Sequence, residues 1–192
     1  MPRSSIFRLT VALALLLAAA PPLAAQRGHQ RKGLWSGVGI GVGSVQLSCQ
    51  ICKGGRDGSF TGFGQIGFAA TPTLLLGAEV ALWYDDGAVD RAIGALEAVT
   101  QFYPRKASGL FLKAGIGLME YRAKDSQDEA SVKALAGQIG VGFDLPITST
   151  IAIAPYLNLH GSTSGNLRFN NTVSSQSIST SLFQAGMVLS FH

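Results

Sequence analysis

The two cysteines of this 192-residue chain lie close together, at Cys49 and Cys52. A pair with this spacing can serve redox exchange, contribute to a metal site or form a disulfide. Redox exchange usually requires a thiol activated at a helix N-terminus, whereas this pair follows a glycine-rich stretch. A zinc site requires more ligands, and His29, His160 and His192 are scattered along the chain. We therefore expect a disulfide that staples a surface loop in an oxidising compartment, and no metal.

His160 and Ser162 form a second pair of interest, because in a strand residues two positions apart lie on the same face. A serine nucleophile beside a histidine base can cleave esters, but the base needs an acidic residue to orient it. No Asp or Glu follows Asp144 in the sequence. We therefore keep hydrolysis as an alternative, and regard the pair first as polar residues at a strand–loop junction.

Apolar residues alternate with small or polar ones along most of the chain, which is the pattern of β-strands with two different faces. The clearest example is 110–118, where every second residue is Leu, Ala or Ile and the residues between are Phe, Lys and Gly. The pattern predicts eight strands, at 34–47, 60–70, 73–84, 90–103, 108–121, 132–145, 150–161 and 178–191. The second and fourth alternate least clearly, so their registers stay open.

The links between the predicted strands differ in length. Short links follow the second, fourth and sixth strands, whereas longer polar links, at 48–59, 122–131 and 161–177, follow the first, fifth and seventh. Short turns at one end and longer loops at the other are typical of transmembrane barrels, with the short turns facing the periplasm.

The direction of the apolar face decides between two kinds of closed barrel. In a soluble barrel this face points inward, and the glycines would lie on a solvent-exposed face, where they weaken strands without benefit. In a membrane barrel the apolar face contacts lipid, and the glycines line a narrow lumen in which small residues relieve crowding. We therefore predict an all-β fold, a closed antiparallel transmembrane β-barrel of about eight strands. A soluble periplasmic barrel that binds a small apolar ligand is the alternative.

Charged and polar residues on the other face should then point into the lumen. The lumen of a small barrel is filled by side chains, and charges within it must pair. The predicted polar network consists of Glu79, Arg91, Glu97, Lys113, Gln138, Asp144, Gln184 and Tyr156. An ion pair of Lys113 with Glu79 or Glu97 is expected. The network would act as a rigid plug or, as an alternative, as a narrow gate that opens when pairs exchange.

Aromatic residues gather near the ends of the predicted strands, where interfacial girdles occur in membrane barrels. The group expected at the end with short turns is Trp35, Phe68, Phe102, Tyr103 and Phe191. The group expected at the other end is Phe60, Trp83, Tyr84 and Tyr121.

The first 25 residues differ from the rest and have the layout of a cleaved signal peptide. Arg3 and Arg8 precede an apolar run at 11–20, and small residues lead to Ala25. We divide the chain into a signal peptide at 1–25, a short segment at 26–33 and a barrel domain at 34–192. Loss of the two arginines lowers the formal net charge from +4 to +2. No concentrated basic stripe favours nucleic-acid binding.

The last predicted strand carries Gln184, Gly186, Leu189 and Phe191, a polar residue and a glycine followed by two spaced hydrophobic residues. This pattern resembles the assembly signal of bacterial outer-membrane barrels, although His192 follows the aromatic residue. With the signal peptide and the strand pattern, the mature chain resembles small OmpA-, OmpX- or OmpW-like barrel domains.

The resemblance implies a protein of the outer membrane that contacts its lipid and is inserted by the barrel-assembly machinery through its C-terminal strand. We expect a monomer without cofactors, and a non-enzymatic role in envelope structure, surface interaction or narrow-pore passage. Some eight-stranded outer-membrane barrels are lipid A deacylases with a His-x-Ser pair and a Glu. A lipid-modifying enzyme that uses His160 and Ser162 is therefore the alternative that the resemblance adds.

Overall fold

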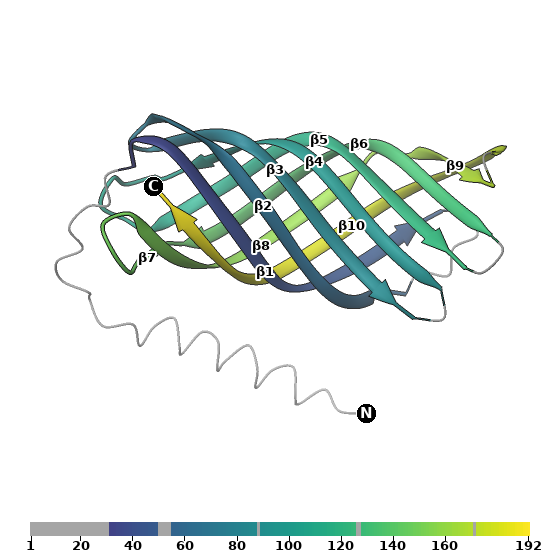
Figure 1. Ribbon diagram of the computed structural model, residues 1–192. Coiled ribbons are helices and arrows are strands. Elements are labelled where there is room, and N and C mark those ends of the chain that lie inside the picture. Colours follow the sequence, from purple (N-terminus) through teal and green to yellow (C-terminus); the bar gives the residue numbers. More distant parts are fainter. Residues whose placement is uncertain (1–30, 50–54, 88, 126–127, 171) are drawn as a thin grey trace, which may run out of the picture.

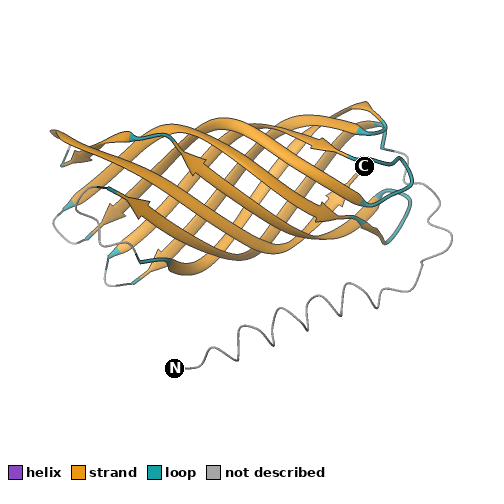
Figure 2. Cartoon of the chain, turned by 180° about the vertical axis from the view of Figure 1, so that it is seen from behind, coloured by secondary structure: helices purple, strands orange, loops and turns teal. Residues whose placement is uncertain are grey.

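The chain forms one antiparallel sheet that closes on itself (Figures 1 and 2). The computed structural model describes residues 31–49, 55–87, 89–125, 128–170 and 172–192, and the predicted signal peptide and Cys52 lie outside them. The strands within the described residues are β1 (Gly33–Ser48), β2 (Asp57–Thr71), β3 (Leu74–Asp86), β4 (Asp90–Phe102), β5 (Leu110–Lys124), β6 (Glu129–Phe143), β7 (Leu145–Pro146), β8 (Ile151–Ser162), β9 (Gly165–Phe169) and β10 (Thr172–Phe191). No helix among the described residues is long and apolar enough to cross a membrane.

The ring closes because β1 pairs with β2 on one side and with β10 on the other. Both β8 and β9 lie between β6 and β10, so together they occupy one position in the ring. The short β7 continues β6 along the same edge of β8, since Gly142 lies opposite Tyr156 and Leu145 lies opposite Ile153 in one unbroken register. The barrel therefore has eight strand positions, which confirms the predicted architecture.

One end of the barrel, which we call the turn end, carries the β2–β3, β4–β5 and β6–β8 links and the C-terminus (Figure 1). The opposite end, called the loop end, is where the strands extend beyond the predicted bounds. The prediction of a loop at 161–177 is wrong, because β9 and the start of β10 pair there with each other and β9 also pairs with β6. The backbone ladder persists in this hairpin although its Ser, Thr and Asn residues lack the apolar alternation that marks a membrane-spanning strand.

The outer surface is an apolar belt, as the membrane barrel requires. Large side chains on alternate positions are exposed on every side of the ring, among them Val38, Ile66, Leu96, Ile116 and Ile139. A monomeric soluble protein rarely exposes an apolar surface of this extent. The belt therefore contradicts the soluble ligand-binding alternative.

The prediction of two aromatic girdles is wrong for four of its nine members. The residues that lie buried inside the barrel are Trp35, Trp83, Tyr103 and Tyr121. Those that are exposed on the outside are Phe60, Phe68, Tyr84, Phe102 and Phe191. Adjacent residues of a strand point to opposite faces, so Trp83 cannot share a girdle with Tyr84 although both lie near the same strand end.

Inward-facing glycines permit the close approach of neighbouring strands. Gly41 of β1 lies opposite Gly186 of β10, and a Cβ added to Gly41 would meet the carbonyl oxygen of Ala185 at 2.1 Å. Gly67 of β2 lies opposite Gly77 of β3 in the same way, and a Cβ on Gly67 would be 2.0 Å from the Leu76 carbonyl oxygen. Glycine is therefore required at these points, where the backbones of neighbouring strands approach each other closely.

Candidate functional site

A belt of polar side chains crosses the lumen between its two ends. Its members come from six different strands, point inward and are almost completely buried. We call Glu79, Glu97, Lys113, Gln138, His160 and Gln184 the polar belt. The belt brings together five of the predicted network residues and adds His160.

Two carboxylates form the centre of the belt. Glu79 on β3 lies directly opposite Glu97 on β4, an arrangement in which like charges destabilise a sheet. Lys113 donates to Glu79, and Gln138 donates to Glu79 at 2.9 Å and to Glu97 at 2.6 Å. The expected ion pair of Lys113 is thus made with Glu79.

His160 is another member of the belt that contacts Glu97. Its Nδ1 lies 3.0 Å from Oε2 of Glu97, and its Nε2 lies 2.9 Å from Oε1 of Gln184. The amide nitrogen of Gln184 donates to Thr61, whose hydroxyl donates to a backbone carbonyl. Both ring nitrogens are therefore engaged within the belt, one by a carboxylate and the other by an amide oxygen.

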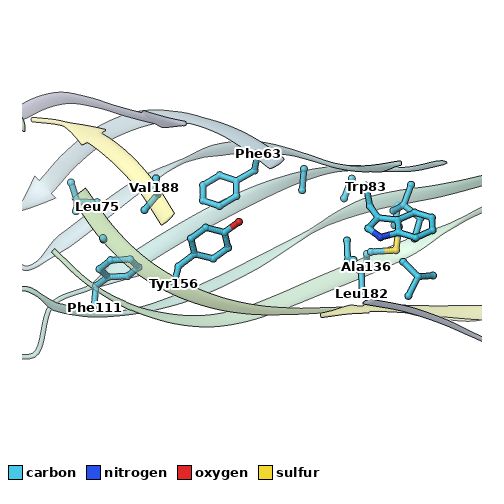
Figure 3. Close-up of a cluster of buried hydrophobic side chains, with 14 of the residues drawn as sticks. Phe63, Leu75, Trp83, Phe111, Ala136, Tyr156, Leu182 and Val188 are labelled. Atoms are coloured by element: carbon cyan, nitrogen blue, oxygen red, sulfur yellow. The ribbon is translucent and has the colours of Figure 1, made fainter. Parts of the chain in front are cut away.

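Buried apolar side chains form two groups along the lumen, as Figure 3 shows, one that includes Leu75 and Phe111 and another that includes Trp83 and Leu182. On β3, Glu79 lies between Leu75 toward the turn end and Trp83 toward the loop end, and both of these side chains are fully buried. Phe63 and Tyr156 pack edge to face, with ring centroids 5.0 Å apart, next to the belt. Side chains thus occupy the lumen along its length, in the manner of a packed core.

A separate polar cluster lies inside the turn end. Arg31, which precedes β1, stacks 3.5 Å above the ring of Tyr103 and lies 3.5 Å from the carboxylate of Asp144. The hydroxyl of Tyr103 donates to the same Asp144 oxygen at 2.9 Å. Arg31 also donates to the backbone oxygen of Ser108. The cluster therefore ties the segment before the first strand to two turns of the barrel.

Arg91 lies apart from the belt, at the loop end. Its guanidinium binds Asp85 on the neighbouring strand and Asp57 at the start of β2. The side chain of Arg91 is 29% exposed and that of Asp57 is 51% exposed. Arg91 thus belongs to a solvated ion cluster on the rim, which we call the rim cluster.

The geometry bears directly on the hydrolase alternative. Glu97 supplies an acidic partner for His160. It precedes His160 by 63 positions, so the absence of an acidic residue after Asp144 did not exclude such a partner. However, both ring nitrogens of His160 are engaged by Glu97 and Gln184, and the ring is fully buried. The hydroxyl of Ser162 instead accepts a hydrogen bond from the backbone of Thr180 at 2.9 Å. This arrangement lacks the base–nucleophile contact that hydrolysis requires.

Among the described residues, Glu79, Glu97 and His160 have the geometry that could hold a metal ion, with ligand atoms within 4.8 Å of one another. Lys113 already binds Glu79, and both ring nitrogens of His160 are engaged by Glu97 and Gln184. We therefore interpret the group as an ion-pair network.

Several lumen residues were missed by sequence reasoning. Gln65 on β2 accepts a hydrogen bond from Gln101 on β4 at 3.0 Å, and both are buried. Asn158 and His160 are also buried inside the barrel, and the alternation of a strand does not predict the height at which an inward residue lies. Arg31 lies in a segment with no alternation, so no signal marked it.

The C-terminal strand places the predicted assembly signal on both faces. Gln184 points into the lumen, whereas Leu189 and Phe191 are exposed on the outside. Recognition of this strand by assembly machinery stays a prediction. The Cys49–Cys52 disulfide also stays a prediction, because Cys52 lies outside the described residues.

No known family model matches the sequence, and no curated protein matches it. Solved structures, however, share its fold. The structure of Neisserial surface protein A aligns with a TM-score of 0.58 at 11% identity, over 82% of this chain and 96% of that one. The outer membrane protein OprG from Pseudomonas aeruginosa aligns with a TM-score of 0.50 at 12% identity, over 85% and 99% of the two chains.

At these identities the similarity establishes the fold, which is that of a small bacterial outer-membrane β-barrel. The predicted fold class is thereby confirmed. The apolar belt and this fold agree with the predicted location in the outer membrane.

Proposed function

We propose that the protein is a non-conducting, non-enzymatic barrel that anchors its loop-end hairpins at the cell surface. The observation that carries this proposal is the occupied lumen, in which the polar belt is enclosed by buried apolar layers. A plug of paired charges and packed rings stabilises the barrel. Because the lumen is filled, we expect the protein to act through its outer surfaces. The orientation that we adopt places the short turns in the periplasm.

Conductance in planar lipid bilayers tests this proposal. We expect wild-type protein to give no steady ion current, whereas the double variant Trp83→Ala and Tyr156→Ala, which removes a large ring on each side of the belt, should conduct. A wild-type protein that conducts steadily, without voltage or pH steps, would contradict the proposal.

A narrow gate is the second candidate, and one observation favours it. Oε1 of Glu97 has no hydrogen-bond partner although it is buried, so Lys113 has an alternative acceptor near its present partner Glu79. If pairs exchange, wild-type protein should show brief openings that disappear in the variant Glu97→Gln. A silent wild-type trace would favour the plug over the gate.

We further expect the barrel to be a monomer whose C-terminal strand is read by the assembly machinery. Phe191 is exposed on the outer face, so replacement by Ala removes little packing within the barrel. The variant Phe191→Ala should therefore refold normally in detergent but reach the membrane less efficiently in cells. The matched variant Phe183→Ala, on the same strand and face, should be inserted normally.

A further inference from the structure

A groove lies on the outer surface of the barrel, across strands β3 to β6 in the half nearest the loop end. It has a volume of about 410 Å³ and includes Val80, Leu96 and Leu118 in its lining. Gly94 forms part of its floor, because the missing side chain leaves the surface open there. A Cβ built on Gly94 would come no closer than 3.9 Å to its nearest neighbour, an atom of Leu82.

Charged residues border the same groove. Glu120 accepts a hydrogen bond from Nε of Arg122 at 2.7 Å and lies 3.5 Å from Nζ of Lys133. The two cations are 58% and 69% exposed, whereas Glu120 is 26% exposed. The acid thus holds two outward-facing cations beside an apolar depression.

We propose that this groove is a binding site for a phosphorylated glycolipid of the outer leaflet, of the lipid A class. One acyl chain lies in the groove over Gly94, and a phosphate binds Arg122 and Lys133. Arginine and lysine together suit a phosphate, through directed N–H donors and a point charge respectively. The apolar lining lies next to the cationic border, as the acyl chains of such a lipid lie next to its phosphates. The inference rests on the outer-membrane orientation proposed above, but not on whether the lumen conducts.

The neighbouring strand shows that an exposed glycine alone does not make this site. Gly64 on β2 also faces outward into open space, with nothing within 4 Å of an added Cβ. Its cross-strand neighbours are Val38 and Val80, which are both apolar. Gly64 therefore offers a matched control for Gly94, because it lacks the cationic border.

Native mass spectrometry of the detergent-refolded protein, titrated with lipids, tests the proposal. The probes are diphosphorylated lipid A, its dephosphorylated form, phosphatidylglycerol and phosphatidylcholine. We expect the protein to retain diphosphorylated lipid A most strongly. Retention should fall roughly tenfold, a loss of one charge-assisted contact or more, in the double variant Arg122→Gln and Lys133→Gln.

The variant Gly94→Leu keeps every charge but fills the groove, and it should lose retention to a similar degree. Gly64→Leu and the double variant Arg105→Gln and Lys106→Gln, which removes two exposed cations at the turn end, should retain the lipid normally. Heat-modifiable gel migration checks that each variant is folded.

Equal retention by all folded variants would overturn the site. Equal or stronger retention of phosphatidylglycerol, lost in the same variants, would overturn the assignment to a glycolipid and identify a phospholipid site instead. Either result leaves the conductance test of the plug unaffected, so the two proposals fail separately.

Discussion

The polar belt and the rim cluster contain the same kinds of charged groups in very different surroundings. In the belt, the side chains of Lys113 and Glu79 are 2% and 0% exposed, whereas those of Arg91 and Asp57 on the rim are 29% and 51% exposed. Removing one partner of a buried ion pair leaves an uncompensated charge and costs much stability. Solvated pairs contribute little, because water and salt screen them. Burial, rather than the number of ion pairs, therefore decides how much stability this barrel loses when a charged residue is replaced.

Replacement of Lys113 by Met should have the largest effect. It leaves the opposed carboxylates of Glu79 and Glu97 without the lysine that compensates them, so we expect a loss of about 3–5 kcal/mol in the free energy of unfolding. Urea unfolding in lipid vesicles, followed by tryptophan fluorescence, measures it. The control Lys106→Met alters an exposed turn residue and should change the free energy by less than about 0.5 kcal/mol. Similar losses in both variants would contradict the comparison.

The contact between Glu97 and His160 should appear as an energetic coupling. In a double-mutant cycle with Glu97→Gln and His160→Gln, we expect a coupling of about 0.5–3 kcal/mol, because the two residues share a buried hydrogen bond. A parallel cycle with Glu79→Gln, a residue that bonds Lys113 and Gln138 instead, should give a smaller coupling. If the Glu79 cycle gives the larger value, the pairing within the belt is assigned wrongly.

Loss of the Tyr103 hydroxyl should have a moderate effect. The variant Tyr103→Phe removes a buried hydrogen bond to Asp144, which we expect to lower the free energy of unfolding by about 1–2 kcal/mol. Tyr156→Phe is the matched control, because the buried hydroxyl of Tyr156 has no hydrogen-bond partner among the described residues. That control should be neutral or slightly stabilising. An equal loss of stability in the two variants would contradict the contribution that we assign to the hydrogen bond between Tyr103 and Asp144.

The smallest effect is expected at the rim. Arg91→Gln removes two solvated ion pairs and should lower the free energy of unfolding by no more than about 1 kcal/mol, with a loss that shrinks in high salt. Unfolding curves at low and high ionic strength measure both features. A loss as large as that of Lys113→Met would mean that the rim is effectively buried in the membrane-inserted protein.

Much of the fold was accessible from the sequence. The alternation at 110–118 predicted both the strand and its faces, since Leu112 and Ile116 contact the exterior while Phe111 and Lys113 lie inside. The prediction of a loop at 161–177 is wrong because strands that pair beyond the membrane need no apolar face. These strands therefore lack the alternation by which the others were predicted. The prediction of the girdles is partly wrong because aromatic residues near the same strand end can point to opposite faces of the sheet.

The sequence by itself determined the eight strand positions of the ring, the barrel class and the inner face on which Glu79, Glu97 and Lys113 lie. These features follow from a period of two, which is a local property of a strand. Only the tertiary structure decided that Glu97 contacts His160 and that Arg31 reaches Asp144, 113 positions away. The stagger of the strands around the closed ring sets which inward residues share a height. That stagger is a property of the whole ring, so no single strand of the sequence records it.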